Sequence, residues 1–374
     1  MMRTKLALLT NFIPPYRLPF YSEISKRMSD VLFILNTKME RNRHWTVDWG
    51  NLNVFVSKSL IVKKKWSIAN GINEMTEVHI PFDILFLLIQ YRPEFVISSE
   101  FGMRSLHALI YKLMYPRTKW LIWATLSERS EADRGKIRTL LRKWMIKFVD
   151  GVYVNGKSGK NYIIHLGLSS DRISIIPYTI DNRLFSAVYK PKKAVKPNKL
   201  LYSGQLIERK GLQYFLPSLR EWCIKNQRNI EVNIVGDGPL KNWIKNFDSS
   251  DYLKITLYGG IDYPQLPEIY AKNHIFIFPT IVDEWGVVVN EALASGLPIL
   301  GSQYSQAVEE LIIEGYNGWI FQPDDRNSVH QALDRALNIS ETTFMDMQNQ
   351  AIHSISHITP EKVSKKMIDF LGEV

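Results

Sequence analysis

Short runs of β-branched and aromatic residues alternate with helical stretches along the whole 374-residue chain. This alternation is typical of parallel sheets covered by helices, and it predicts an α/β fold. The strands expected in the first half are Lys5–Leu9, Val31–Leu35, Phe95–Ser98, Trp120–Ala124, Val152–Asn155 and Ile173–Pro177. Those expected in the second half are Leu200–Ser203, Val232–Val235, Ile255–Leu257, Ile275–Phe278 and Pro298–Gly301.

The chain is too long for one ordinary core, so we expect two Rossmann-like, doubly wound domains facing a cleft. The first spans residues 1–188 and the second spans 200–358. Residues 189–199, which are rich in Pro and Lys, form the expected linker. A C-terminal helix at about 359–374 is expected to pack back onto the first domain. Ligands of such sheets bind beyond the carboxyl ends of strands, so the loops there should carry the chemistry.

The composition limits where the protein works. A single cysteine, Cys223, excludes an internal disulfide and fits a reducing, cytoplasmic location. We expect no signal peptide, because no long apolar stretch follows the weakly basic start. The most apolar segment, Ile80–Ile89, contains Asp83 and is far shorter than the roughly 20 apolar residues that span a bilayer.

Positive charge is concentrated in the first half of the chain. Residues 1–185 contain 28 Lys and Arg against 15 Asp and Glu (+13), whereas the remainder has 19 against 22 (−3). This excess favours an anionic partner for the first half. No nucleic-acid motif is present, so an anionic membrane surface is the better candidate and nucleic acid is not expected.

Residues 135–149 have the periodicity of an amphipathic helix that would bring the protein to such a membrane. The apolar positions are Leu140, Leu141, Trp144, Met145 and Phe148, and the cations are Arg138, Arg142, Lys143 and Lys147. The alternative is a helix that packs its apolar side on the core and leaves its basic side in water.

The segment Tyr202–Gly211 (YSGQLIERKG) is the first candidate for chemistry. A strand ends at Gly204, and Arg209 and Lys210 open the next helix. Two cations beside a helix N-terminus suit a diphosphate, because Arg donates forked hydrogen bonds and the helix end is positive. The alternative, a solvated helix start, is unfavourable because cations there oppose the helix dipole. We expect both side chains to line a solvent-filled loop.

The segment Asp283–Pro298 (DEWGVVVNEALASGLP) is the second candidate, with a helix expected from about Gly286. Asp283 precedes this helix and Glu291 lies more than a turn into it, so the two carboxylates suit hydroxyls on different parts of a ligand. Val235–Pro239 (VGDGP) is a third, weaker candidate in which Gly236 allows close backbone approach. Turns of this kind occur in any α/β fold.

Together these segments resemble the retaining GT-B glycosyltransferases of family 4, and the resemblance covers nearly the whole chain. Further matches are Gly259-Gly260, Ile275–Pro279, Glu291–Pro298 and Gly315–Gly318. The resemblance implies a UDP- or GDP-sugar donor and a glycan or lipid-linked acceptor. It also implies a role in bacterial surface polysaccharide synthesis, such as lipopolysaccharide.

The resemblance also implies a role for each matching residue. Arg209 and Lys210 would bind the donor diphosphate, Glu291 the ribose, and Asp283 the transferred sugar. Backbone amides around Gly286, Val287 and Val288 would complete the phosphate site, with Gly204 and Gly236 in the neighbouring donor-binding turns. Two positions depart from the family: Asp283 stands where Glu is usual, and Leu121–Thr125 lacks the His found in many members.

Arg17 and Glu100, each after a strand of the first half, are candidates for the acceptor side. A structural role is the alternative for Arg17. The eight histidines show no metal-ligand spacing and no Asp-x-Asp pair occurs, so we expect no metal and no cofactor. The predicted activity is metal-independent glycosyl transfer with retention (EC 2.4). The alternatives are a sugar-nucleotide epimerase of the same fold and a donor-binding partner subunit with impaired catalysis.

Overall fold

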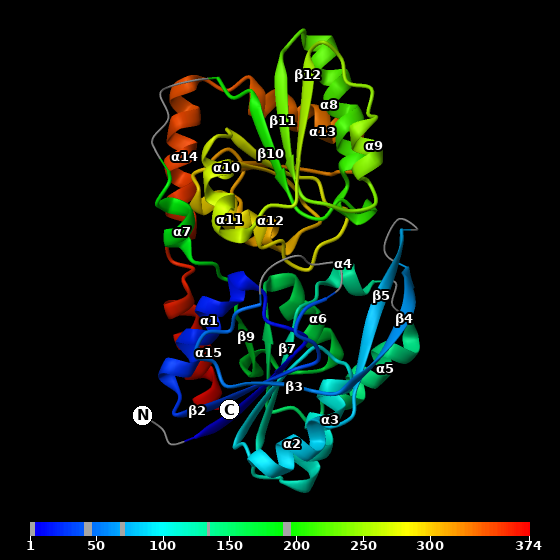
Figure 1. Cartoon of the computed structure of the whole chain (residues 1–374), viewed down its shortest axis with the longest axis vertical. Helices are drawn as coiled ribbons and strands as arrows, with labels where there is room; N and C mark the ends of the chain where they lie inside the picture. The colour runs from blue at the N-terminus through cyan, green and yellow to red at the C-terminus, as the bar shows by residue number, and fades with distance from the viewer. Residues whose placement is uncertain (1–3, 41–46, 68–71, 133–134, 190–195) are drawn as a thin grey trace. The chain divides into compact units, whose positions relative to one another are not determined.

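The computed structural model describes residues 4–40, 47–67, 72–132, 135–189 and 196–374 (Figure 1). The chain forms two compact units: an N-terminal unit of residues 1–180 and 360–374, and a C-terminal unit of residues 181–359. Of the predicted linker 189–199, residues 190–195 lie outside the described residues. Each unit is built around its own parallel sheet.

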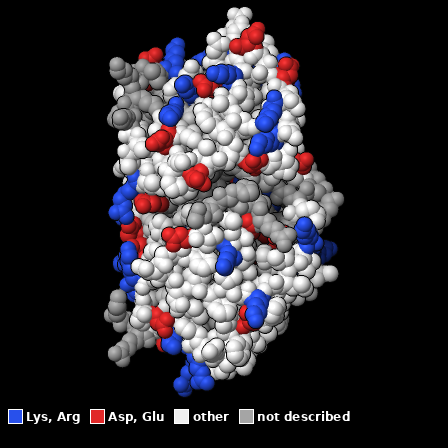
Figure 2. Space-filling model, viewed as in Figure 1, with Lys and Arg blue, Asp and Glu red and all other residues white. Residues whose placement is uncertain are grey.

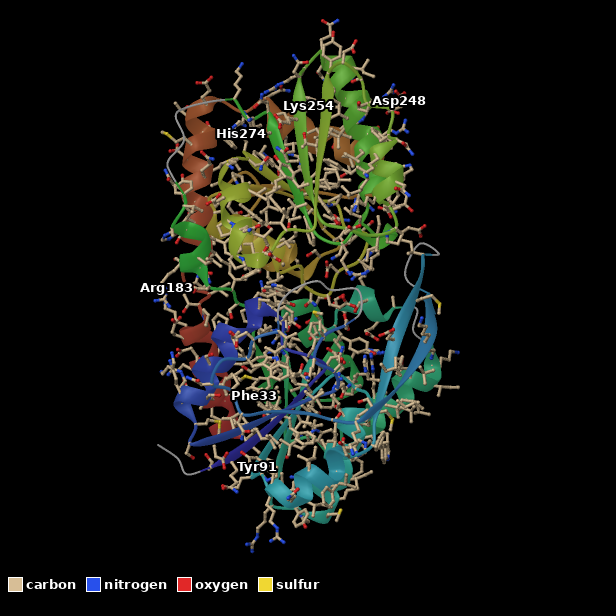
Figure 3. All side chains as sticks on the ribbon, viewed as in Figure 1. Phe33, Tyr91, Arg183, Asp248, Lys254 and His274 are labelled. Carbon is tan, nitrogen blue, oxygen red and sulfur yellow. The ribbon has the colours of Figure 1, made fainter. Side chains whose placement is uncertain are left out.

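The sheet of the N-terminal unit has the order β3-β2-β1-β6-β7-β8-β9, with every pair parallel. Its strands are β1 (Lys5–Thr10), β2 (Asp30–Leu35), β3 (Val54–Val56), β6 (Phe95–Ser99), β7 (Lys119–Ala124), β8 (Gly151–Val154) and β9 (Ile173–Ile175). The strands expected in this half are all present, and β3 is additional. Buried apolar side chains cover both faces of the sheet. Phe33 on β2, labelled in Figure 3, is one of them.

A separate antiparallel hairpin of β4 (Ser59–Ser67) and β5 (Asn73–Pro81) was not predicted. The apolar run Leu60–Val62 of β4 leads directly into Lys63 and Lys64, which breaks the alternation expected of a strand with one buried face. The side chains from Leu60 to Lys64 are exposed, so burial does not impose that alternation here.

Helices cover both faces of the N-terminal sheet. From β6 to β9 the sheet is built in one direction, whereas the step from β1 to β2 runs in the other direction. Right-handed crossovers therefore place the later helices on one face and α1 on the opposite face. The later helices are α2 (Ile84–Tyr91), α3 (Met103–Met114), the short α4 (Glu128–Glu131), α5 (Lys136–Met145) and α6 (Lys157–Leu166). Helix α1, on the opposite face, spans Leu18–Arg27.

Helix α15 (Pro360–Glu373) completes the N-terminal unit by packing beside α1. The Tyr153 hydroxyl on β8 donates a 2.7 Å hydrogen bond to the carbonyl oxygen of Met367. The Phe370 ring lies 5.4 Å from the Tyr153 ring and covers Gly151, where a Cβ would meet it at 3.0 Å. The chain thus returns to its first sheet after the C-terminal unit has been built.

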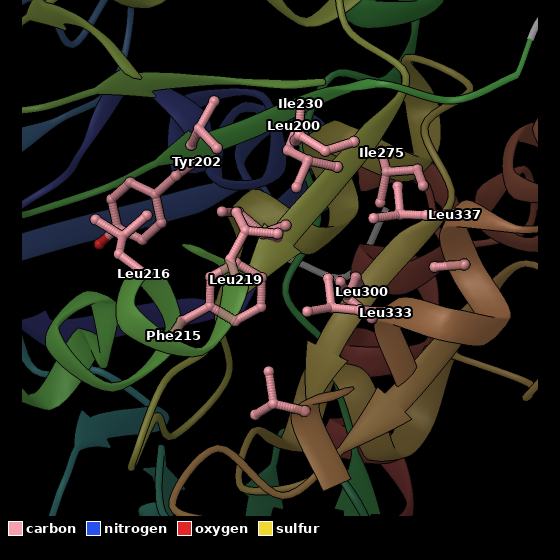
Figure 4. Close-up of a cluster of buried hydrophobic side chains, with 14 of the residues drawn as sticks. Leu200, Tyr202, Phe215, Leu216, Leu219, Ile230, Ile275, Leu300, Leu333 and Leu337 are labelled. Carbon is pink, nitrogen blue, oxygen red and sulfur yellow. The ribbon is translucent and has the colours of Figure 1, made fainter. Parts of the chain in front are cut away.

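The C-terminal sheet has the order β12-β11-β10-β13-β14-β15 and is also parallel. Its strands are β10 (Lys199–Ser203), β11 (Ile230–Val235), β12 (Leu253–Gly259), β13 (Ile275–Phe278), β14 (Ile299–Ser302) and β15 (Gly318–Phe321). Its helices are α7 (Asn182–Ser186), α8 (Leu212–Asn226), α9 (Lys241–Lys245), α10 (Leu266–Ala271), α11 (Val288–Ala294), α12 (Gln306–Leu311), α13 (Arg326–Leu337) and α14 (Glu341–Ile355). Figure 4 shows the core where Phe215 and Leu219 of α8 meet Leu333 and Leu337 of α13 over the strands.

Both sheets start in the middle and grow outward in two directions, which is the doubly wound arrangement that was predicted. The direction changes between β1 and β6 in the first unit and between β10 and β13 in the second. The division of the chain differs from the predicted one at residues 181–188, because α7 packs on α10 and α11 in the C-terminal unit. Within the described residues, no helix is long and apolar enough to cross a bilayer.

Candidate functional site

Two loops of the C-terminal unit meet at its switch point, one after β10 and one after β13. Residues Glu208–Lys210 form a 3-10 turn, η4, immediately before α8. The Arg209 carbonyl oxygen accepts hydrogen bonds from the Ile281 amide (2.8 Å) and the Thr280 hydroxyl (3.0 Å). Gly211, with φ +78°, leaves room for the Pro279 carbonyl, which any Cβ would overlap. These contacts place the two cations beside the loop that contains Asp283.

Lys210 and Asp283 form a buried ion pair across the two loops. Only 13% of the Lys210 side chain and 11% of the Asp283 side chain are exposed. The expectation that Lys210 lines a solvent-filled loop is therefore wrong, because Asp283 draws it inward over the Phe278 ring. Burial raises the pKa of Asp283, but Lys210 and then Arg209 outweigh burial and hold that pKa below its usual value.

Arg209 lies at the edge of this ion pair and is half-buried. Its Nη1 atom donates a 3.4 Å hydrogen bond to the Val282 carbonyl oxygen. Arg209, Lys210 and Asp283 together hold one net positive charge at the carboxyl ends of β10 and β13. Glu284 also acts electrostatically on Lys210, so an anion here would be held by the hydrogen-bond donors of Arg209 and Lys210 rather than by an excess of positive charge.

Glu291 lies on α11 and is buried, with 3% of the residue exposed. One of its carboxylate oxygens accepts a 2.8 Å hydrogen bond from the hydroxyl of Tyr270 on α10. Burial raises the pKa of Glu291 to about 7, against the opposing effect of the Tyr270 hydrogen bond. Sequence reasoning missed Tyr270, since nothing in the segment YAKN marks its tyrosine as the partner of a carboxylate 21 residues later.

Gly286 ends the loop that leads into α11. Its φ is +98°, and an added Cβ would lie 2.5 Å from the Phe278 ring. Because Gly286 is left-handed, α11 starts at Val288, with Val287 as its N-cap, two residues later than predicted. The buried Trp285 indole donates a 2.9 Å hydrogen bond to Asn290 and fixes the loop on the helix.

Gly204 and Gly236 lie where two loops of the C-terminal unit contact each other, which the sequence did not reveal. The Gly204 amide donates a 3.0 Å hydrogen bond to the Val235 carbonyl, and the Leu206 amide donates one of 2.9 Å to Asp237. Gly236 has φ +136°, and a Cβ there would overlap the Gly204 carbonyl oxygen. The loops after β10 and β11 therefore run against each other, and this contact by itself requires glycine at position 236.

Arg17 lies at the switch point of the N-terminal unit, at the end of the 3-10 turn η1 (Pro15–Arg17). Only 8% of the residue is exposed. Its guanidinium carbon lies 3.7 Å from the Tyr178 ring centroid and 4.4 Å from that of Trp123. Its Nη1 atom is 3.4 Å from the Tyr21 hydroxyl. Aromatic rings thus hold this buried cation. Tyr21 lies four residues later in the same segment, whereas Tyr178 and Trp123 come from distant segments and were not predictable from it.

Glu100 follows β6 at the same switch point, with a left-handed φ of +64°. Its Oε1 atom accepts a 2.9 Å hydrogen bond from the Thr125 amide. The Thr125 hydroxyl in turn lies 2.9 Å from the Tyr178 hydroxyl. Glu100 and Arg17 are therefore linked through Thr125, the last residue of the stretch that lacks a histidine, and Tyr178.

Helix α5 differs from both expectations for residues 135–149. Arg142 is buried and forms an ion pair with Glu131 and a 2.9 Å hydrogen bond with the Tyr162 hydroxyl. Its assignment as a membrane-facing cation is therefore wrong. The core-facing alternative is also wrong for most of the apolar side, because Leu140, Leu141 and Trp144 are 69%, 57% and 46% exposed.

Over the part of the chain that the structure describes, no group of three or more His, Cys, Asp or Glu is placed to hold a metal ion.

Comparison with known proteins shows what the C-terminal unit is similar to. Residues 187–353 match the family of glycosyl transferases group 1. Several relatives, among them the following two, match more residues than the C-terminal unit contains. An uncharacterised 41.2 kDa protein in the cps region of Klebsiella pneumoniae is 21% identical over 68% of this chain and 69% of its own length. A Campylobacter jejuni α-1,4-N-acetyl-D-galactosaminyltransferase, named for an undecaprenol-linked acceptor, is 22% identical over 64% of each chain.

Solved structures extend the likeness to the whole chain. Sucrose-phosphate synthase from Thermosynechococcus elongatus has a TM-score of 0.73 at 15% identity over 99% of each chain. Anabaena HepE in complex with UDP has a TM-score of 0.72 at 13% identity, over 99% of this chain and 100% of that one. At these identities the likeness shows the fold, and the predicted GT-B fold class is confirmed.

Proposed function

We propose that this protein is a glycosyltransferase that moves a sugar from a nucleotide-diphosphate donor to a glycan or lipid-linked acceptor. The observation that carries the proposal is the buried ion pair of Lys210 and Asp283 beside Arg209, at the switch point of the C-terminal sheet. Doubly wound sheets bind ligands at this place. The match of residues 187–353 to glycosyl transferases group 1 supports the same assignment.

Negative charge grows on the donor diphosphate as the bond between sugar and phosphate breaks. Arg209 and Lys210 would donate hydrogen bonds to that charge, and the 15-residue helix α8, which starts at Leu212, adds its positive end. These groups are fixed before the reaction by the contacts of η4 with residues 279–283. Preorganised donors of this kind are usually the largest single contribution to catalysis.

Glu291 is proposed to accept hydrogen bonds from the donor ribose. Tyr270 occupies one carboxylate oxygen, which leaves lone pairs on the carboxylate for hydroxyl donors. Asp283 is proposed to contact the transferred sugar, and Gly204, Gly236 and the amides of Gly286, Val287 and Val288 to border the diphosphate. UDP is the first nucleotide to test, because HepE was solved with it.

We propose that transfer retains the anomeric configuration and needs no metal. The leaving phosphate oxygen would take the proton of the acceptor hydroxyl, so no protein base is required. Two cationic side chains would take the place of a metal at the diphosphate. The name of the Campylobacter relative, which includes an undecaprenol-linked acceptor, supports a lipid-linked acceptor here. We further propose a role in surface polysaccharide synthesis at the cytoplasmic face of a membrane.

Release of the nucleotide diphosphate from UDP- and GDP-linked sugars, tested one at a time, examines the proposal. We expect slow hydrolysis of one donor and its loss in Arg209→Ala. With an acceptor glycan added, an α-linked donor should give an α-linked product by NMR. A protein that binds UDP by calorimetry but releases none from any donor would instead be the impaired partner subunit. The absence of a histidine from the stretch ending at Thr125 favours that candidate. Conversion of a donor into its epimer would identify an epimerase.

A further inference from the structure

Two neighbouring helices of the N-terminal unit point apolar stripes into solvent. On α5, Ile137 and Leu140 are 79% and 69% exposed, and Leu141 and Trp144 complete a stripe spaced i, i+3, i+4, i+7. On α3, Leu106, Ile110, Leu113 and Met114 form a second stripe spaced i, i+4, i+7, i+8 and are 37–57% exposed. Such spacing places the residues of each stripe on one side of its helix. In a helix that packs only on a core, that side is buried.

In an ordinary surface helix the apolar side is buried and the polar side is exposed, whereas α5 exposes most of its apolar side. Its buried side contains Arg142, neutralised by Glu131, together with Met145. Its larger apolar residues lie on the other side. The C-terminal unit has no comparable stripe among its described residues: its exposed large apolar residues, Tyr214, Ile224, Tyr258, Ile313 and Met345, are separated along the chain. Contiguous apolar exposure of this kind marks an interaction surface.

The exposed stripes belong to one face of the N-terminal unit. Helices α3, α5 and α6 connect successive strands from β6 to β9, so right-handed crossovers set them side by side on one side of the sheet. The Arg142 guanidinium of α5 lies 5.2 Å from the ring of Phe101, two residues before α3. On the other side of α3, His107 contacts the Pro81 carbonyl at 2.9 Å and so joins the hairpin to it. The hairpin adds exposed Leu60, Ile61 and Met75.

Cations accompany the apolar stripes. Lys136, Arg138 and Lys147 are exposed and Lys143 is half-buried, all on or just after α5. Neither α3 nor α5 contains an acidic residue, and residues 103–149 hold eleven Lys and Arg against three Asp and Glu. Figure 2, which has the same view as Figure 1, shows cationic and acidic side chains interspersed over the surface that faces the viewer.

We propose that the surface formed by α3, α5 and the β4–β5 hairpin inserts into an anionic lipid bilayer. Apolar stripes with Lys and Arg at their margins are the pattern of helices that lie in the headgroup region, with the apolar side in the acyl chains. A second copy of the chain is the less suitable occupant, because it would bring two basic surfaces together. The sequence suggested only electrostatic attraction to the membrane, which salt weakens. The proposal adds insertion of apolar side chains, which persists where salt screens the charges. It is independent of the proposed transfer reaction.

Flotation of the full-length protein with vesicles tests the proposal. We expect binding to vesicles of phosphatidylcholine with 30 mol% phosphatidylglycerol, weaker binding to pure phosphatidylcholine, and a bound fraction that high salt reduces without abolishing. Changing Ile137, Leu140, Leu141 and Trp144 to Gln should abolish the binding that persists at high salt and leave only weak binding at low salt. Changing Lys136, Lys143 and Lys147 to Gln should weaken binding at low salt about 10²-fold, from roughly 1 kcal/mol per cation. Arg142 is left in place because it is structural.

The matched control is Ile313→Gln, which removes an apolar side chain that is 61% exposed on the C-terminal unit. It should float like the wild type, and all variants should bind UDP equally in calorimetry if they are folded. Acyl chains brominated in the anionic vesicles should quench the fluorescence of the wild type more than that of Trp144→Phe. Equal flotation by the α5 variant, no flotation with either vesicle, or a dimer that the α5 variant converts into a monomer would each overturn the proposal.

Discussion

The Lys210 ammonium and the Asp283 carboxylate form a buried ion pair that joins the loop after β10 to the loop after β13. Removing one partner of such a pair leaves the other charge buried and uncompensated, which costs about 3–5 kcal/mol. Replacing both partners by neutral side chains of similar size is often nearly neutral. The effect of removing one charge of the pair on stability therefore depends on whether the other charge is present.

We expect Lys210→Met and Asp283→Asn each to lower the free energy of unfolding by about 3–5 kcal/mol, and the double variant to recover much of that loss. Urea denaturation of the four proteins measures the coupling. The control is the exposed pair of Arg220 and Asp248, 3.0 Å apart, with Asp248 87% exposed and labelled in Figure 3. Its coupling should stay below about 1 kcal/mol. Additive losses at Lys210 and Asp283 would show that the two charges do not interact.

Arg209→Ala should reduce transfer while leaving the fold intact, because the side chain is half-buried and its backbone carbonyl makes the contacts with Thr280 and Ile281. Loss of one donor to the leaving diphosphate typically lowers turnover about 10²–10³-fold. Steady-state kinetics with the identified donor, alongside a thermal melt, gives both quantities. Turnover close to that of the wild type would remove Arg209 from the diphosphate site.

Glu291 should make stability depend on pH, because its pKa is raised to about 7 in the folded protein. The unfolded chain ionises this carboxyl near its ordinary pKa of about 4.3, so folding favours the protonated form. The resulting cost is absent at acidic pH, grows as pH rises, and reaches about 3–4 kcal/mol above pH 7. Glu291→Gln should therefore be more stable than the wild type at pH 8 and about equally stable at pH 4.

The same variant should bind nucleotide diphosphate more weakly than the wild type at pH 8, because an amide is a poorer acceptor for ribose hydroxyls than a carboxylate. Calorimetry with UDP and urea denaturation at the two pH values are the measurements. Higher stability of the variant with unchanged UDP affinity would show that Glu291 affects folding but does not bind the ribose.

Gly236→Ala should destabilise the C-terminal unit by about 2–4 kcal/mol, because the new Cβ overlaps the Gly204 carbonyl and the φ of +136° is strained for alanine. Gly260→Ala is the matched control: a Cβ at Gly260, just after β12, meets nothing within 4 Å. Thermal unfolding of the two variants decides. If Gly236→Ala melted at the same temperature as Gly260→Ala, the loops after β10 and β11 could move apart with little loss of stability.

Transfer should survive EDTA, since Arg209 and Lys210 are proposed to neutralise the leaving diphosphate. The measurement is the initial rate of nucleotide release before and after chelation, with and without added Mg²⁺ or Mn²⁺. A strict requirement for either ion would contradict the proposed division of charge at the site.

The sequence predicts most strands of the two sheets because they are short apolar runs bounded by turns. Two edge strands, β3 and β15, were not predicted. The β4–β5 hairpin escaped prediction because residues 60–64 of β4 are all exposed, so its sequence does not alternate between apolar and polar residues. Arg209, Lys210, Asp283 and Glu291 could be singled out by residue type and position. Their partners could not: Tyr270 reaches Glu291, and Tyr178 and Trp123 reach Arg17, through tertiary contacts between distant segments.

Helix α15 has a consequence for the order in which the units can fold. It belongs to the N-terminal unit, yet the ribosome makes it after all of residues 181–359. Until then β8 lacks the cover of Phe370, and the Tyr153 hydroxyl lacks its acceptor at Met367. During synthesis the C-terminal unit therefore has its whole sequence available first, and the unit begun earliest is finished last.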